Sequence, residues 1–162
     1  MNNKVAVLFV CMGNICRSPT AQGVMEKLLA HEGVADRVLV DSAGTHDYHI
    51  GKPPDERAQA VARKRGIDIS RQRARQADRD DFEQFDYVLA MDRDNLELLR
   101  AICPRGSEER LRLFLEFAPQ LERTDVPDPY WGAPDGFERV LDMIEAAADG
   151  LLADIRQRHF NN

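Results

Sequence analysis

The sequence predicts a single α/β domain built on a four-stranded parallel sheet with helices on both faces. Two observations predict this class. Short apolar runs alternate along the chain with longer segments in which apolar residues recur at helical spacing, the order typical of strands joined by crossover helices. The first run, residues 5–10, is apolar at every position, as expected for a strand that is buried on both faces of a sheet.

The first strand leads into a loop and then into a helix. The strand covers residues 5–10, and the helical pattern covers about residues 19–31, with Gly33 just past its end. Ser18 is a suitable cap for this helix, and Pro19 suits its first position. We therefore expect a tight loop between the two elements.

A second strand and a second helix follow. Residues 38–40 predict the second strand, which ends at Asp41-Ser42-Ala43-Gly44. Residues 45–54 are rich in turn-forming and polar residues and predict a loop. A helix is expected from Asp55 to about residue 65, stopped by Gly66.

The middle of the chain holds the third strand. Residues 67–81 are polar and show no clear pattern, and residues 82–85 predict a short helical turn. Residues 87–91 predict the strand itself. Asp92 is expected to cap the helix that follows, which Pro104 closes.

The last part of the chain completes the sheet. Residues 110–115 predict the fourth strand, and residues 123–134, with three prolines, predict a loop. The final helix begins near residues 133–135, and its apolar stripe has a period of about 3.6 residues. The stripe consists of Phe137, Val140, Leu141, Ile144, Ala148, Leu151, Leu152 and Ile155. The domain is expected to span residues 1–162, with a loose tail over the last few residues.

Composition limits the classes of function. The chain has 162 residues and a net charge of −6 at pH 7, which argues against a general nucleic-acid-binding protein because phosphate backbones require a basic surface. No apolar run approaches the roughly 20 residues that span a bilayer, so no membrane partner is expected. Three cysteines without the spacing of a disulfide framework fit a reducing compartment, and the cytoplasm is the expected location.

Residues 11–18, Cys-Met-Gly-Asn-Ile-Cys-Arg-Ser, form a candidate anion site. The backbone N–H groups of a loop that opens a helix point inward, and the helix N-terminus carries partial positive charge. The same field favours the thiolate form of Cys11, and Arg17 offers a planar fork for two phosphate oxygens. Gly13 lets the backbone curl around an anion, and Asn14 tolerates a left-handed conformation. A nucleophile and an oxyanion binder therefore lie in one loop.

Simpler interpretations of these residues stay open. A lone cysteine at a strand end is often a small buried residue, and Ser18 either caps the helix, donates to the Cys11 thiolate, or does both. Other loop motifs do not fit. A Walker loop ends in Gly-Lys-Ser/Thr, and a zinc site needs a second pair of ligands beside Cys11 and Cys16. A Cys-x-x-Cys redox motif is also absent.

Thiolate attack on a phosphoester also requires a proton donor, because the leaving group is poor. A carboxylic acid can supply this proton. Asp128 is the best candidate, because prolines on both sides restrict its backbone. Spacing alone does not separate it from Asp125 or Asp92, and an aspartate beside a proline is often only a turn residue.

Four motifs together carry a resemblance to a known family. They are residues 11–19, Asp41-Ser42-Ala43, Met91-Asp92 and Asp128-Pro129-Tyr130. With these motifs, in this order and at this length, the chain resembles the low-molecular-weight protein tyrosine phosphatases. The resemblance covers almost the whole chain. The early position of the cysteine loop and the late Asp-Pro-Tyr are together more specific than the loop alone.

The resemblance implies a role for each matching residue. Cys11 would form a cysteinyl-phosphate intermediate, Arg17 and the loop N–H groups would hold the phosphate oxygens, and Asp128 would protonate the leaving oxygen and then activate water. Ser18 would stabilise the thiolate. The residues expected to contact substrate are Met12, Gly13, Asn14, Ile15, Cys16, Ser18, Tyr48, Tyr130 and Trp131, and those expected to support the loop are Asn14, Ser42 and Asp92.

The same resemblance sets the expected partners. No cofactor and no metal is implied, since the loop and Arg17 supply the positive charge. The expected substrate is a phosphotyrosine-containing protein or a small aryl phosphate. Inorganic phosphate or another oxyanion is expected in the loop, and the protein is expected to be a monomer or a weak dimer.

Other residues near the loop have less determined roles. In the family, the cysteine matching Cys16 can form a disulfide with the nucleophile, and packing beneath the loop is the alternative. Aromatic residues at the rim would favour an aromatic phosphoester, although the family often has Trp where Tyr48 stands. His46 and His49 lie near this rim and could touch substrate, but we expect both to be solvated loop residues. We expect the arginines of residues 71–79 to form a solvated face.

Two other functions stay open. An arsenate reductase on the same scaffold would use Cys11 and two further cysteines in a mobile segment, but the middle of the chain has none and Cys103 stands alone. A non-catalytic phosphate-binding module would need neither the nucleophile nor the proline-framed Asp128. The sequence therefore favours metal-independent hydrolysis of phosphotyrosine monoesters.

Overall fold

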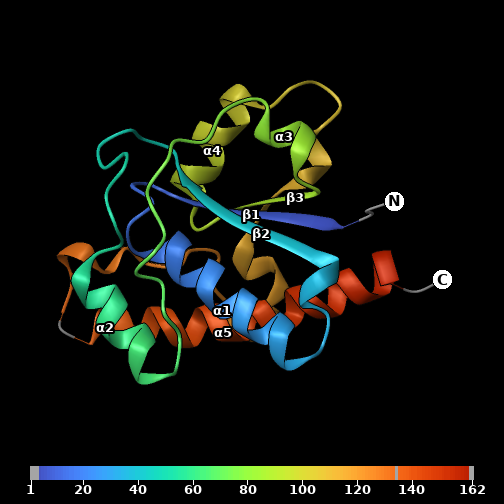
Figure 1. The fold of residues 1–162 in the computed structure, drawn as a ribbon. Helices are drawn as coiled ribbons and strands as arrows, with labels where there is room; N and C mark the ends of the chain where they lie inside the picture. Colours follow the sequence, from blue (N-terminus) through green and yellow to red (C-terminus); the bar gives the residue numbers. More distant parts are fainter. Residues whose placement is uncertain (1–3, 134, 161–162) are drawn as a thin grey trace.

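The computed structural model describes residues 4–133 and 135–160 and places one parallel sheet between two layers of helices (Figure 1). The strands are β1 (Val5–Cys11), β2 (Val38–Gly44), β3 (Tyr87–Ala90) and β4 (Leu111–Leu113). They lie in the order β2-β1-β3-β4, and every neighbouring pair is parallel. The predicted four-stranded α/β class is confirmed.

The helices cover both faces of the sheet. One face carries α1 (Arg17–His31), α2 (Glu56–Lys64) and α5 (Gly136–Ile155), and the other carries α3 (Asp81–Gln84) and α4 (Arg93–Ile102) (Figure 1). Short 3₁₀ turns lie at Ala35–Arg37, Glu108–Arg110, Phe114–Phe117, Pro119–Leu121 and Pro129–Trp131, and a π-helical turn, Arg156–Phe160, follows α5.

The central strand β1 is buried at every position, which explains its continuous apolar run. Val5, Val7 and Phe9 belong to the core beneath α1 and α5. Ala6 and Leu8, which alternate with them, belong to the core beneath α3 and α4. β1 lies between β2 and β3, so its carboxyl end is in the middle of one edge of the sheet. Ligands of open α/β sheets bind at this edge.

Helix α1 begins at Arg17, two residues earlier than expected, so Pro19 is not its first residue. Ser18 is not the cap, because it lies within the first turn, and the residue before the helix, Cys16, makes no side-chain cap. The expectation was wrong because both side chains make contacts at the site instead: Oγ of Ser18 contacts the Cys11 sulfur, and Arg17 binds Asp92.

Two strand boundaries also differ from expectation. β2 includes Asp41 to Gly44, the segment at which it was expected to end, because the polar side chain of Ser42 is buried against other polar groups. β4 ends at Leu113, and the 3₁₀ turn that follows places the Phe114 ring 4.9 Å from the Phe9 ring. In both cases a contact with a distant part of the chain decides the local structure.

The other elements agree with the predictions. α2, α3, β3, α4 and α5 lie within a few residues of their expected bounds, and Asp92 caps α4 by accepting a 2.7 Å hydrogen bond from the N–H of Asn95. The chain is helical up to Phe160, and the rest of the expected tail, residues 161 and 162, lies outside the described residues. In the described part of the chain, none of the helices has both the length and the apolar character needed to cross a bilayer.

Candidate active site

A cavity of about 320 Å³ lies at the carboxyl end of β1, between the loop of residues 11–16, the loop after β2 and the 3₁₀ turn Pro129–Trp131. Its lining residues are Cys11, Met12, Gly13, Ile15, Cys16, Arg17, Tyr48, His49, Asp128, Tyr130 and Trp131. Three segments that are far apart in the sequence therefore meet at one cavity. Asn14 and Ser18, which were expected to contact substrate, are buried behind its wall.

The sulfur of Cys11 has two polar neighbours. Its Sγ lies 3.0 Å from Oγ of Ser18 and accepts a 3.3 Å hydrogen bond from the backbone N–H of Asn14. Only 2% of Cys11 is exposed, and this exposure faces the cavity. Hydrogen bonds to a sulfur anion stabilise it, so the arrangement suits a thiolate nucleophile.

Asn14 holds the loop in its curled shape. Its φ is 58°, the left-handed conformation that an asparagine tolerates. Its Nδ2 donates to Oγ of Ser18 at 2.8 Å and to Oγ of Ser42 at 3.0 Å, and its Oδ1 accepts from the backbone N–H of Arg75 at 3.0 Å. Ser42 in turn donates to Gln22 at 2.8 Å. These bonds fix the loop against β2 and α1.

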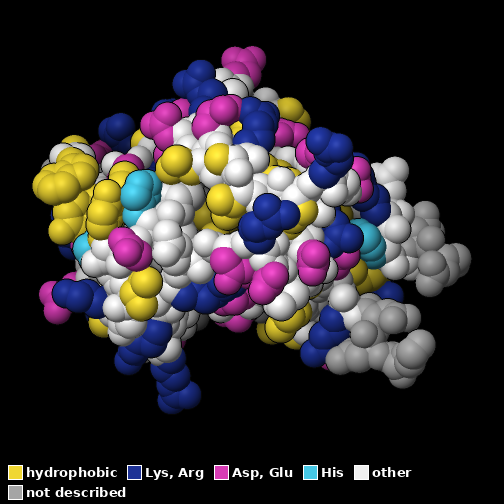
Figure 2. All heavy atoms as spheres, turned by 90° about the horizontal axis from the view of Figure 1, so that it is seen from above, with side chains coloured by type: hydrophobic (Ala, Val, Ile, Leu, Met, Phe, Trp, Pro, Cys, Tyr) yellow, Lys and Arg dark blue, Asp and Glu magenta, His cyan; other side chains and the backbone are white. Residues whose placement is uncertain are grey.

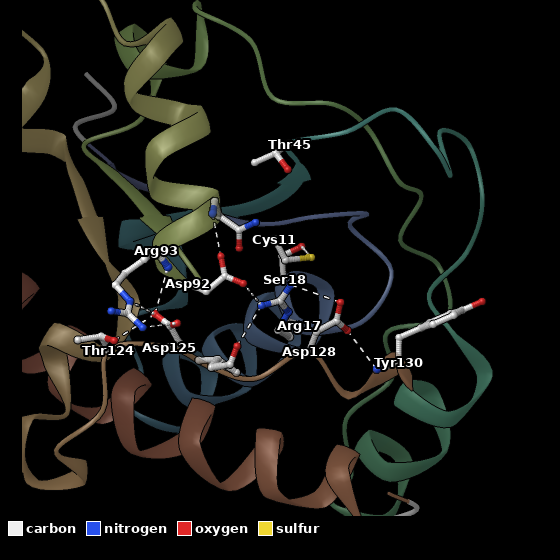
Figure 3. Close-up of polar contacts among 12 residues, drawn as sticks. Cys11, Arg17, Ser18, Thr45, Asp92, Arg93, Thr124, Asp125, Asp128 and Tyr130 are labelled. Atoms are coloured by element: carbon white, nitrogen blue, oxygen red, sulfur yellow. Dashed lines mark hydrogen bonds and ion pairs between the residues drawn. The ribbon is translucent and has the colours of Figure 1, made fainter. Parts of the chain in front are cut away.

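Arg17 is the cation of the site, and 2% of its side chain is exposed. Its Nη1 donates to Oδ2 of Asp92 at 2.6 Å and to the carbonyl oxygen of Val126 at 3.0 Å (Figure 3). Its Nη2 lies 3.7 Å from Oδ2 of Asp128. Burial alone would lower the pKa of Arg17, but the negative charges of Cys11, Asp92 and Asp128 outweigh it and raise that pKa. The guanidinium is therefore charged and fixed in direction.

The three candidate acids separate clearly in space. Asp128 lines the cavity, with 30% of its side chain exposed, and its Oδ1 accepts from the N–H of Tyr130 at 3.0 Å. Asp92 lies behind Arg17 and caps α4. Asp125 is bound to the backbone N–H and the guanidinium of Arg93 and does not line the cavity (Figure 3). Asp128 is the carboxylate placed to meet a leaving group.

Cys16 also lines the cavity, but only 5% of the residue is exposed. Burial raises the pKa of its thiol, and the charges of Asp55 and Cys11 raise it further. Cys16 is therefore a protonated thiol at neutral pH, which is a poor nucleophile. Cys103 lies at the end of α4 and does not line the cavity.

Aromatic side chains form the rim of the cavity. Tyr48 and Trp131 are 64% and 84% exposed, and Tyr130 and Trp131 meet edge to face with ring centroids 4.7 Å apart. Hydrophobic side chains gather at this end of the molecule (Figure 2). An exposed apolar rim above a polar floor suits a substrate with an aromatic body and an anionic end.

The expectation for the histidines was wrong. His49 lines the cavity, and a Cβ on Gly13 would approach within 2.9 Å of its ring. His46 is half-buried and stacks on Tyr48 with ring centroids 4.9 Å apart. The loop that carries them folds back over the loop of residues 11–16, and no local sequence pattern predicts this contact between the two loops.

The expected solvated face of arginines was wrong at Arg75. Its guanidinium forms ion pairs with Asp41 and Asp81 at 3.1 and 3.0 Å, and its backbone N–H binds Asn14. Sequence reasoning also missed Gly44, where a Cβ would lie 2.8 Å from the carbonyl oxygen of Met12. Glycine is needed there because two backbone segments pass in close contact.

Comparison with known proteins gives a consistent result. The family model described as "Low molecular weight phosphotyrosine protein phosphatase" matches residues 6–160. The low molecular weight protein-tyrosine-phosphatase YfkJ of Bacillus subtilis is 38% identical over 94% of this chain and 97% of its own length. A low molecular weight protein-tyrosine-phosphatase of Streptomyces coelicolor is 41% identical over 94% of each chain.

Solved structures agree in fold. The protein tyrosine phosphatase from Entamoeba histolytica, with Hepes in its active site, has a TM-score of 0.92 at 38% identity and covers 95% of this chain and 98% of its own. Vibrio vulnificus Wzb, solved in complex with benzylphosphonate, has a TM-score of 0.81 at 31% identity, with coverages of 93% and 98%.

Proposed function

The chain belongs to the low molecular weight phosphotyrosine protein phosphatase family and is a phosphatase, and we propose that it hydrolyses phosphotyrosine monoesters through a cysteinyl-phosphate intermediate on Cys11. One observation carries the proposal. Cys11, Arg17 and Asp128 line the same cavity, and the sulfur of Cys11 accepts a hydrogen bond from the N–H of Asn14 and lies 3.0 Å from the Ser18 hydroxyl. A nucleophile, an oxyanion binder and an acid are the groups that this reaction needs.

In the first step, the Cys11 thiolate attacks phosphorus. An S–P bond forms, the bond between phosphorus and the tyrosyl oxygen breaks, and Asp128 gives its proton to the departing oxygen. The N–H groups of the loop and the guanidinium of Arg17 hold the three equatorial phosphoryl oxygens. Asp92 keeps Arg17 aimed at this position through the 2.6 Å ion pair.

In the second step, water attacks the phosphocysteine. The Asp128 carboxylate takes a proton from the water, a P–O bond forms, and the S–P bond breaks to release inorganic phosphate and the Cys11 thiolate. Ser18 stabilises the sulfur as a leaving group because its hydroxyl lies 3.0 Å from Sγ. The product, inorganic phosphate, occupies the same loop as the substrate.

The rim defines the substrate class in this proposal. Tyr48, Tyr130 and Trp131 offer apolar faces to an aromatic ring whose phosphate reaches the cavity floor. The binding of benzylphosphonate, an aromatic ring on a phosphonate, to a relative supports the same class. We expect a phosphotyrosine protein or a small aryl phosphate as substrate.

The cellular setting is also part of the proposal. Cys11, Cys16 and Cys103 are free thiols, which fits the cytoplasm. We expect a monomer, or a weak dimer formed through the exposed rim, and sedimentation across a range of concentrations distinguishes the two.

Hydrolysis of p-nitrophenyl phosphate in the presence of EDTA is the primary test. The wild-type protein should be active, and Cys11→Ser should bind phosphate without turnover. A protein that needs added metal, or a Cys11→Ser variant with near wild-type rate, contradicts the proposal.

Asp125→Ala is a matched control for Asp128→Ala, because both aspartates lie on the same loop and Asp125 binds Arg93. Asp128→Ala should lower kcat/KM on phosphotyrosine by about 10²–10⁴-fold, and much less on an ester whose leaving group needs no proton. Asp125→Ala should stay near wild type on both substrates. Equal losses for the two variants would assign the acid to another group.

A further inference from the structure

We propose that Arg57, in the first turn of α2, is a positioning residue that ties the nucleophile loop to the acid loop. The inference rests on the proposed function, because it assigns Arg57 a role in placing the general acid Asp128. It concerns a residue that does not line the catalytic cavity. A chain of three contacts runs from one loop to the other.

The first contact fixes the start of α2 on the nucleophile loop. The backbone N–H of Asp55 donates a 2.8 Å hydrogen bond to the carbonyl oxygen of Ile15. Asp55 is also the residue that caps α2, through the N–H of Arg57 at 2.8 Å. The helix N-terminus therefore has a fixed position relative to the loop that carries Cys11.

The second contact fixes the direction of the Arg57 side chain. Its Nε donates to Oδ1 of Asp55 at 3.0 Å and its Nη2 donates to Oδ2 at 2.9 Å, a bidentate pair. Burial alone would raise the pKa of Asp55, but the hydrogen bonds from Arg57 outweigh it and hold that pKa below its usual range. The guanidinium is therefore held in one plane although 52% of the side chain is exposed.

The third contact reaches the acid loop. Nη1 of Arg57 donates to the carbonyl oxygen of Tyr130 at 3.3 Å. The guanidinium carbon lies 5.1 Å from the ring centroid of Tyr130 and 4.8 Å from that of Phe137. These are cation–π distances, so Arg57 holds both the backbone and the ring of Tyr130.

Tyr130 passes this restraint to Asp128. Its backbone N–H donates to Oδ1 of Asp128 at 3.0 Å, which leaves Oδ2 to face Arg17 and the cavity. A catalytic group displaced by about 1 Å loses up to roughly 10²-fold in rate. Arg57 thus keeps Asp128 in a fixed position relative to Cys11, although the two loops that carry these residues are far apart in the sequence.

A double-mutant cycle tests this role. Arg57→Ala should lower kcat/KM on free phosphotyrosine by roughly tenfold, with little change on an aryl phosphate whose leaving group needs no proton. In the Asp128→Ala background, Arg57→Ala should cause no further loss, because the group that it positions is gone. Arg63→Ala, an exposed arginine on the same helix, is the matched control and should stay near wild type.

Three outcomes would overturn the inference. An equal loss on both substrates would show a binding or general structural role, and a full additional loss in the Asp128→Ala background would show action independent of the acid. An unchanged kcat/KM in Arg57→Ala would show no role. In each of these cases, the Asp128→Ala variant itself tests the proposed function. If it still loses far more activity on phosphotyrosine than on an ester whose leaving group needs no proton, the proposed function stands and only the Arg57 role fails. A urea unfolding curve confirms that each variant is folded.

Discussion

Replacement of Asp92 separates two roles that one carboxylate performs. Its Oδ2 pairs with Nη1 of Arg17 at 2.6 Å, and its Oδ1 accepts the N–H of Asn95 at 2.7 Å to cap α4. Asp92→Asn removes the charge and retains an oxygen that can cap the helix, since Asn is as good a cap as Asp. Asp92→Ala removes both.

The expected loss of stability follows from burial. Removal of one partner of a buried ion pair costs about 3–5 kcal/mol. Arg17 is 2% exposed, but Asp92 is 19% exposed, and Arg17 keeps its bond to the Val126 carbonyl. We therefore expect Asp92→Asn to lower the free energy of unfolding by about 2–3 kcal/mol. Asp92→Ala should lose about 1 kcal/mol more, the contribution of a helix cap.

Urea unfolding is the suitable assay, because guanidinium chloride is a salt and screens ion pairs. An Asp92→Asn variant within about 0.5 kcal/mol of wild type would refute the ion-pair argument, since surface substitutions have effects of that size. Equal stabilities of Asp92→Asn and Asp92→Ala would refute the capping argument.

Three further predictions concern the nucleophile loop. Ser18→Ala removes the hydroxyl 3.0 Å from the Cys11 sulfur and should lower kcat/KM by about 10–100-fold, as expected for a hydrogen bond to a charged group; a variant with half of the activity or more would contradict this role. Asn14→Ala removes three side-chain hydrogen bonds and places alanine at φ 58°, a conformation that asparagine tolerates better. Its free energy of unfolding, measured in urea, should fall by about 2–3 kcal/mol. A fall of less than about 1 kcal/mol would contradict the role of Asn14 in holding the loop. Burial raises the pKa of Cys16 in the folded state, so the folded protein holds that proton more tightly than the unfolded chain. The free energy of unfolding should therefore fall as pH rises above about 8.5, and Cys16→Ala should lessen the fall; an identical pH dependence would contradict it.

The fold was predictable where a segment carries a clear local pattern, such as an apolar stripe, an apolar run or a helix cap. α5 follows its apolar stripe, and the start of α4 follows a capping aspartate whose side chain does bind the helix N-terminus. β1 follows a run that is apolar because both faces of the strand are buried. In these elements the local pattern and the tertiary contacts favour the same structure.

The predictions failed where polar residues serve the site instead of the local element. Ser18 is of a residue type that often caps helices, but its hydroxyl contacts the Cys11 sulfur, and α1 begins one residue before it. Ser42 interrupts an apolar pattern, yet it is buried within β2 because Asn14 and Gln22 satisfy its hydroxyl.

The contacts of two residues of the site could not be predicted from the sequence. His49 lines the cavity because its loop folds over Gly13, and Arg75 supports the loop through its backbone N–H. Neither contact follows from composition, spacing or periodicity. Cys11, Arg17 and Asp128, which the motifs single out, line one cavity, because the carboxyl ends of parallel strands lie at one edge of the sheet.

The central claim is that Cys11 carries the phosphoryl group during turnover, and trapping of that intermediate tests it most directly. The Asp128→Ala variant, mixed with an aryl phosphate whose leaving group needs no proton, should accumulate phosphocysteine because the water-activating carboxylate is absent. Rapid denaturation and mass spectrometry with fragmentation should place the phosphate on Cys11 and not on Cys16, and the adduct should be missing in Cys11→Ser. Turnover without any adduct on Cys11, or an adduct on another residue, would contradict the account.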